Sequence, residues 1–160
     1  MALTGVAATV VTALVAPGLE AVAAGREADG ARSFALGDGG SSLDPAGAVT
    51  LTPEAGWWVE PRASTLWLSS PDRALGVELR VVSEREARDA LEGARAGGDP
   101  LLTETLASGA LVRHVTEAER FVALAQIGDT VVLLEAAAAP EAALADYRVA
   151  LGRLLGSLAA

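Results

Sequence analysis

The chain has 160 residues, a length that suits one domain with a genuine hydrophobic core. It contains no cysteine, which excludes a disulfide framework, thiol chemistry and an acyl-cysteine lipid anchor. Its formal net charge of −9 and the absence of an arginine cluster argue against a nucleic-acid partner, because phosphate binding needs a basic patch.

The first segment of the chain is apolar. Residues 1–19 carry no charged side chain, and residues 21–25 have the small side chains of a signal-peptidase site. We therefore expect residues 1–24 to form an apolar helix that acts as a signal peptide or a transmembrane anchor. Arg26 and Arg32 follow the segment, and the positive-inside rule would place them in the cytoplasm, against export. A helix that packs on the domain or on a partner remains open.

Residues 25–46 are rich in glycine, aspartate, serine and alanine and have no sustained apolar period. This composition predicts a flexible linker between the apolar segment and a globular domain over residues 47–160. Phe34 and Leu36 are the apolar anchors that could dock this arm onto the domain.

The first half of the domain has the period of two that is typical of strands. Val49 and Leu51 alternate with threonines, and a turn then leads into "WWVE", residues 57–60. The strands "TLWLS", residues 65–69, and "ALGVELRVVS", residues 74–83, follow. The short connection before residue 65 predicts a hairpin.

A helix is predicted after these strands. Ser83 can cap its first turn, and Glu86 stands at the capping-box spacing. Ala87, Leu91 and Ala94 form the apolar stripe, and the helix should stop at the glycines that follow.

The second half repeats this order. After residues 98–109, which form a loop or one short helix, strands are predicted over residues 110–116, 120–127 and 130–136. Pro140 should open a final helix that runs to about Leu158. The expected fold is α+β: an antiparallel sheet of about six strands in two meanders, covered by helices in the order βββ-α-βββ-α, plus the N-terminal apolar helix.

A strand that leads into "LTPEAGW", with Pro53, Gly56 and Trp57, followed by two meanders and a long closing helix, resembles the PsbP-like α/β/α sandwich family. The resemblance covers residues 47–159 and includes envelope-attached members from actinobacteria. It implies a non-enzymatic subunit, scaffold or binding module, often on the outer side of a membrane.

Trp57 and Trp58 are the candidate site of interest. Neighbours on a strand point to opposite faces, so both cannot enter one core without a bulge, and one should face outward. A hairpin turn at Arg62 and Ala63 would place Trp58 opposite Trp67, and a slip of one residue would bring Trp57 there instead. A helix or the N-terminal arm can cover these rings. Alternatively they form an exposed platform for a protein, glycan or lipid headgroup.

Glu60 and Arg62 would form the polar rim of such a platform, so the candidate binding residues are Trp57, Trp58, Trp67, Glu60 and Arg62.

Catalysis has little support. His114 is the only histidine, no GxSxG motif is present, and a strand histidine is more often packed or hydrogen-bonded than catalytic. One histidine without cysteine argues against a zinc site, and no phosphate-binding loop is present, so we expect no metal, no cofactor and no catalytic residue. Gly152 and Gly156 are expected to allow close packing of the last helix on the sheet.

The leading hypothesis is a non-catalytic binding or accessory domain of the cell envelope, tethered or exported through residues 1–24, with a protein or envelope component as its partner. A cytoplasmic chaperone or adaptor, whose apolar segment packs on a partner, is the alternative. A hydrolase that depends on His114 is a third hypothesis.

Overall fold

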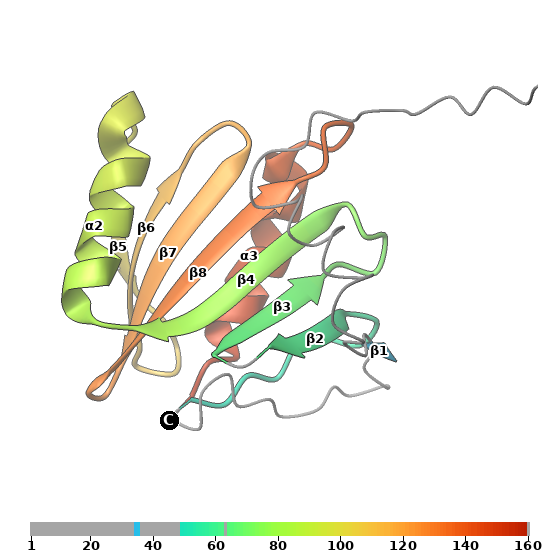
Figure 1. Ribbon diagram of the computed structural model, residues 1–160, viewed down its shortest axis with the longest axis horizontal. Helices are drawn as coiled ribbons and strands as arrows, with labels where there is room; N and C mark the ends of the chain where they lie inside the picture. Colours follow the sequence, from blue (N-terminus) through green and yellow to red (C-terminus); the bar gives the residue numbers. More distant parts are fainter. Residues whose placement is uncertain (1–33, 36–48, 63, 160) are drawn as a thin grey trace, which may run out of the picture.

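The structure, a computed structural model, describes residues 34–35, 49–62 and 64–159. Within them the chain forms one antiparallel sheet of eight strands in the order β1-β2-β3-β4-β8-β7-β6-β5 (Figure 1). The strands are β1 Phe34–Ala35, β2 Trp58–Arg62, β3 Thr65–Ser69, β4 Leu75–Val82, β5 Leu102–Thr105, β6 Leu111–Thr116, β7 Arg120–Ile127 and β8 Thr130–Ala138. The helical elements are α2 Glu84–Ala94, η1 Arg95–Gly97, η2 Leu144–Tyr147 and α3 Arg148–Gly156.

The two halves of the domain share this single sheet because β4 pairs with β8 in its centre. Leu79 lies opposite Leu134, and both side chains are buried. Residues 131–134 of β8 are buried without alternation, because helices pack on both faces of the sheet at this point. The centre of the sheet is therefore the core of the domain.

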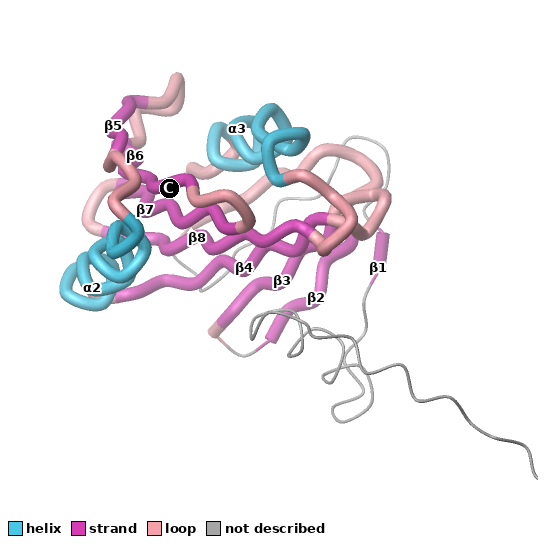
Figure 2. The backbone as a smooth tube through the Cα atoms, turned by 90° about the horizontal axis from the view of Figure 1, so that it is seen from above, coloured by secondary structure: helices cyan, strands magenta, loops and turns pink. Residues whose placement is uncertain are grey.

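The helices lie on opposite faces of the sheet (Figure 2). Leu151, Leu154 and Leu155 of α3 pack against one face together with Val49 and Leu51. On the other face, the side chains of α2 pack on β6, β7 and β8. Each helix is too short to cover a whole face, since α2 has 11 residues and α3 has 9.

The prediction of α2 is confirmed. The Ser83 side chain accepts a hydrogen bond from the Glu86 amide at 3.2 Å, which is the capping interaction. The buried residues of the helix are Ala87, Leu91 and Ala94, and Gly98 ends the helical segment in the left-handed region.

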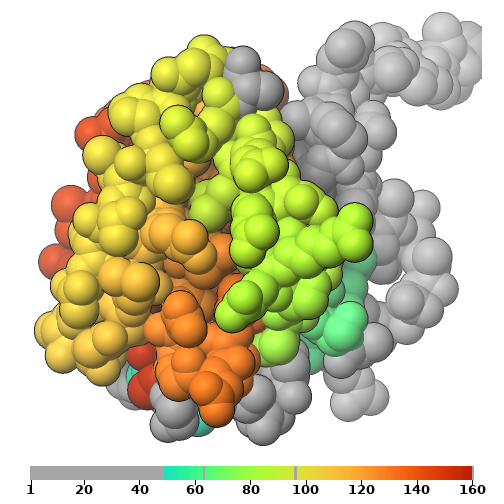
Figure 3. Space-filling view, turned by 90° about the vertical axis from the view of Figure 1, so that its left-hand side faces the viewer, coloured from blue at the N-terminus to red at the C-terminus, as the bar shows by residue number. Residues whose placement is uncertain are grey.

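The expected fold, about six strands in two meanders covered by helices, is wrong. The described chain is mostly one wide sheet with two short helices. The sheet has more strands than expected because β1 and β5 were not predicted. All four residues of β5 are exposed, so the apolar alternation that predicts a strand is absent there. β5 and β6 form the surface at this end of the sheet (Figure 3).

Two further expectations need correction. Pro140 does not open a helix: a turn follows it, and α3 begins only at Arg148. The segment that contains Val49 and Leu51 is not a strand of the sheet, because it forms an isolated bridge in which Thr50 pairs with Ala159 near the end of the chain. Both apolar side chains are nevertheless buried.

The predicted anchor Phe34 lies in β1, opposite Val59 of β2. The predicted apolar helix of residues 1–24 and most of the predicted linker lie outside the described residues. None of the helices in the described part of the chain is long and apolar enough to span a membrane.

Candidate binding surface on the sheet

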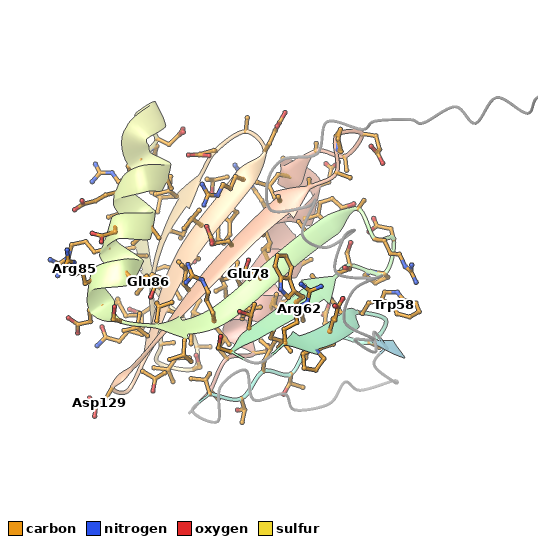
Figure 4. The ribbon with its side chains drawn as sticks, viewed as in Figure 1. Trp58, Arg62, Glu78, Arg85, Glu86 and Asp129 are labelled. Atoms are coloured by element: carbon orange, nitrogen blue, oxygen red, sulfur yellow. The ribbon has the colours of Figure 1, made fainter. Side chains whose placement is uncertain are left out.

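One part of the sheet carries no helix among the described residues. Arg80 of β4 lies opposite Leu133, which packs on α2, so Arg80 is on the α2 face of the sheet. Because α2 covers β6, β7 and β8, the same face of β2, β3 and β4 lies beside the helix and not under it (Figure 4). We call this surface the tryptophan face. Its side chains, assigned by strand pairing, are Trp58, Glu60, Arg62, Thr65, Trp67, Ser69, Glu78 and Arg80.

Trp57 and Trp58 separate as expected. Trp57 is 3 % exposed and belongs to the core on the α3 face. Trp58 is partly exposed on the tryptophan face, and the Arg73 guanidinium lies 4.3 Å from the centre of its ring. The candidate Trp57 is therefore a core residue and does not join the other candidates.

The predicted pairing of Trp58 with Trp67 is wrong. Trp58 lies opposite Ser69, and Glu60 lies opposite Trp67. The hairpin turns one residue later than expected, after the Arg62–Thr65 pair, and this displaces each partner by two positions. Both rings stay on one face as diagonal neighbours, a relation that separates the two residues by roughly 7–8 Å.

The predicted rim residues do lie beside Trp67. The Nε and Nη2 atoms of Arg62 both donate to Oε1 of Glu60, at 3.0 and 2.7 Å. The same guanidinium lies 5.6 Å from the centre of the Trp67 ring. The structure thus brings Glu60, Arg62 and Trp67 together, and the two charges of the rim neutralise each other.

Charged side chains also lie side by side on the neighbouring strands β4 and β8. Glu78 lies opposite Trp67 on one side and opposite Glu135 on the other. Arg80 lies 3.8 Å from the Glu78 carboxylate and 3.9 Å from that of Glu135, and it also pairs with Glu86 of α2. Burial raises the pKa of Glu78, and the neighbouring charge of Glu135 raises it further.

The candidate residues chosen from the sequence did not include Glu78 and Arg80. The available signal was their alternation with Val77, Leu79 and Val81. Their position on the same face as the tryptophans depends on which strands are neighbours, and a single sequence does not reveal strand order.

The turn between β3 and β4 borders the tryptophan face and was also missed. Asp72 accepts hydrogen bonds there from the Ser70 hydroxyl, the Ala74 amide at 3.1 Å and the Tyr147 hydroxyl at 2.7 Å. These bonds hold the pKa of Asp72 below its usual value, chiefly through Ser70 and Tyr147. The bond to Asp72 raises the pKa of Tyr147 to about 12.

His114 lies on the α3 face, far from this surface in the strand order. Its Nε2 atom is 3.6 Å from the Glu104 carboxylate, and its ring lies 5.3 Å from that of Phe121. The buried Nδ1 atom has no hydrogen-bond partner among the described residues. These contacts of His114 include no serine.

The described residues offer no cluster of metal ligands. No group of three or more histidine, aspartate or glutamate side chains among them is placed to hold an ion. Comparison of the chain with protein-family models, with curated proteins and with solved structures found no match.

Proposed function

We propose that this protein is a non-catalytic binding or accessory domain of the cell envelope, tethered or exported through residues 1–24, and that it binds a protein or another envelope component through the tryptophan face. The resemblance to the PsbP-like family is part of this proposal. One observation carries it: the tryptophan face presents Trp58 and Trp67 on adjacent strands, outside the area that α2 covers.

The chemistry of the surface supports this role. Tryptophan and arginine are enriched among residues that dominate binding energy at protein interfaces. Here two partly exposed indole rings each lie beside a guanidinium. Glu60 is buried and holds the Arg62 guanidinium in place, whereas the partly exposed Glu78 carboxylate lies beside Trp67, so a partner meets both apolar and polar groups.

Photo-crosslinking in native-expressing cells tests the binding surface. A photoreactive phenylalanine analogue replaces Trp67 in the full chain, and the matched control carries it at Val149, which is 65 % exposed on α3. We expect a discrete adduct from position 67 only, in the envelope fraction. Equal adducts from both positions, or none from position 67, would contradict the proposal.

The location is tested by cell fractionation with protease accessibility and mass spectrometry of the N-terminus. An externally accessible protein, intact or cleaved after residue 23 or 24, is expected. A soluble cytoplasmic protein that retains residues 1–24 would replace this proposal with the chaperone or adaptor alternative.

A further inference from the structure

Arg73 has an unusual backbone conformation. Its φ of 62° makes it the one non-glycine residue with positive φ among those the structure describes. The left-handed region is unfavourable for a residue with a Cβ atom, so the surrounding contacts must hold it there. Such residues cluster at functional sites, and Arg73 lies in the turn between β3 and β4, which borders the tryptophan face.

Hydrogen bonds to Ser70 and Asp72 fix this turn. The Arg73 amide donates to the Ser70 carbonyl at 2.8 Å, and the Leu75 amide donates to the Ser70 hydroxyl at 2.9 Å. The Oδ1 atom of Asp72 accepts hydrogen bonds from the Ser70 hydroxyl and the Ala74 amide, and its Oδ2 atom accepts one from the Tyr147 hydroxyl. Both oxygens of the Asp72 carboxylate, which is next to Arg73 in the sequence, therefore accept hydrogen bonds from residues other than Arg73.

The Arg73 side chain lies against Trp58. Its guanidinium carbon is 4.3 Å from the ring centre, a cation–π contact, while the residue as a whole is exposed. In contrast, Arg62 and Arg80 of the tryptophan face and Arg120 of β7 each pair with a carboxylate. Arg73 forms no salt bridge within residues 49–62 and 64–159.

A guanidinium that lies on an indole ring keeps its N–H groups in a fixed plane. The parallel N–H groups of a guanidinium match the two oxygens of a carboxylate or a phosphate. Because the indole ring already holds the Arg73 side chain in place, less entropy is lost on binding. Ser69, which lies opposite Trp58 on the same face, adds a hydroxyl nearby. The net charge of −9 opposes long-range attraction of anions, so the site depends on contact geometry.

We propose that Arg73, held on Trp58, binds an oxyanion, a carboxylate or a phosphate group, of the ligand that occupies the tryptophan face. This inference rests on the proposed function, because it names the chemistry by which the same surface recognises its ligand. The isolated anions should bind weakly, with dissociation constants on the order of millimolar.

The test is an NMR titration of the full chain with sodium phosphate and, separately, sodium acetate, at an ionic strength kept constant with sodium chloride. We expect saturable shifts of the Arg73 Nε–H and Trp58 indole N–H signals with at least one of the two anions, and no such shifts for Trp57. A response that chloride reproduces, or no saturable response to either anion, would overturn the proposal.

Two substitutions separate binding from folding. Arg73→Gly removes the guanidinium and also the cost of positive φ, so it should fold and lose binding at least about tenfold. Arg73→Lys keeps the charge without the parallel N–H groups and should bind about fivefold or more weakly than the unchanged chain. Arg85→Ala removes an exposed arginine of α2 and should leave the titration unchanged. Unchanged binding in Arg73→Gly would overturn the inference.

The two proposals can fail separately. Loss of anion binding with a retained adduct from position 67 leaves the proposed function intact and overturns the oxyanion site. Saturable anion binding at Arg73 without any adduct from position 67 supports the oxyanion site and contradicts the wider binding surface.

Discussion

Trp57 and Trp58 are neighbours in the chain with opposite environments. The alternation of a strand sends Trp57 into the core at 3 % exposure and Trp58 to the tryptophan face. The separation was predictable, because it depends on one local geometric rule. The sequence also indicated which ring is buried, because Val59 lies on the same side of the strand as Trp57, whereas Glu60 and Arg62 lie on the side of Trp58.

Tyr147 and Asp72 form a bond whose contribution to stability depends on pH. The pKa of Asp72 lies below 3.8 in the folded state, so the carboxylate stabilises the fold above that value and this contribution is lost as pH falls through the folded pKa. The pKa of Tyr147 rises from 10.0 to about 12, so its contribution is complete below pH 10 and is lost as pH rises through 12.

We therefore expect Tyr147→Phe to lower the free energy of unfolding at pH 7 by about 0.5 to 1 kcal/mol, a modest value because water reaches the bond. Urea unfolding at pH 7 and at pH 2.5 measures it, and the difference from the unchanged chain should shrink at the lower pH. An equal difference at both values would show that lost packing, and not the hydrogen bond, explains the effect.

Glu78 lies between Trp67 and Glu135, and burial raises its pKa above 4.5. A raised carboxyl pKa means that the folded state favours the protonated form, so stability falls as pH rises from 4.5 through the folded pKa. Glu78→Gln should stabilise the fold at pH 7 by about 0.5 kcal/mol and leave it unchanged at pH 3. Thermal unfolding at both pH values measures this. A loss of stability at pH 7 would mean that the contact with Arg80 outweighs the repulsion.

At the scale of elements, the prediction of α2 succeeded because its signals are local. The Ser83 cap and the apolar stripe lie within three turns of chain. The prediction missed strand β5 for the opposite reason. Its residues are exposed, and only their pairing with β6 makes them a strand. The final helix was placed too early because Pro140 is equally suited to a turn.

The predicted close packing of Gly152 and Gly156 on the sheet is wrong. Both glycines are exposed, and a Cβ atom built at either position meets nothing within 4 Å. The apolar stripe of α3, with Leu151, Leu154 and Leu155, points to the sheet instead.

Gly152→Ala should therefore stabilise the protein by about 0.5 to 1 kcal/mol, because alanine has the higher helix propensity and loses less backbone entropy. Chemical denaturation measures the change. Gly156→Ala is the matched control at the helix end and should give a smaller gain. A destabilised Gly152→Ala protein would contradict the open space that the structure shows beside this position.

At the scale of the whole molecule, the ends of the domain meet. Thr50 and Ala159 exchange backbone hydrogen bonds at 2.7 and 3.0 Å, and Val49, Leu51 and Leu158 are almost fully buried around them. The segment before β2 and the segment after α3 therefore close one core.

A chain of residues 47–160 should unfold cooperatively and keep a strand-rich circular dichroism spectrum, because its core includes all buried residues of the sheet from β2 to β8. Removing residues 47–52 as well should cost at least about 3 kcal/mol through the loss of Val49 and Leu51. Urea unfolding of both chains tests this. Non-cooperative unfolding of residues 47–160 would place an essential part of the core before residue 47.

The sequence by itself determined the features that depend on near neighbours in the chain: the alternating strands, the capped helix α2 and the opposite directions of Trp57 and Trp58. Tertiary structure alone decided which strands are neighbours. The β4–β8 pairing merges two meanders into one sheet, and the register of β2 on β3 places Glu60, not Trp58, opposite Trp67. The physical reason is that strand order and register follow from the burial of apolar side chains distant in sequence, and from the exact residue at which a hairpin turns.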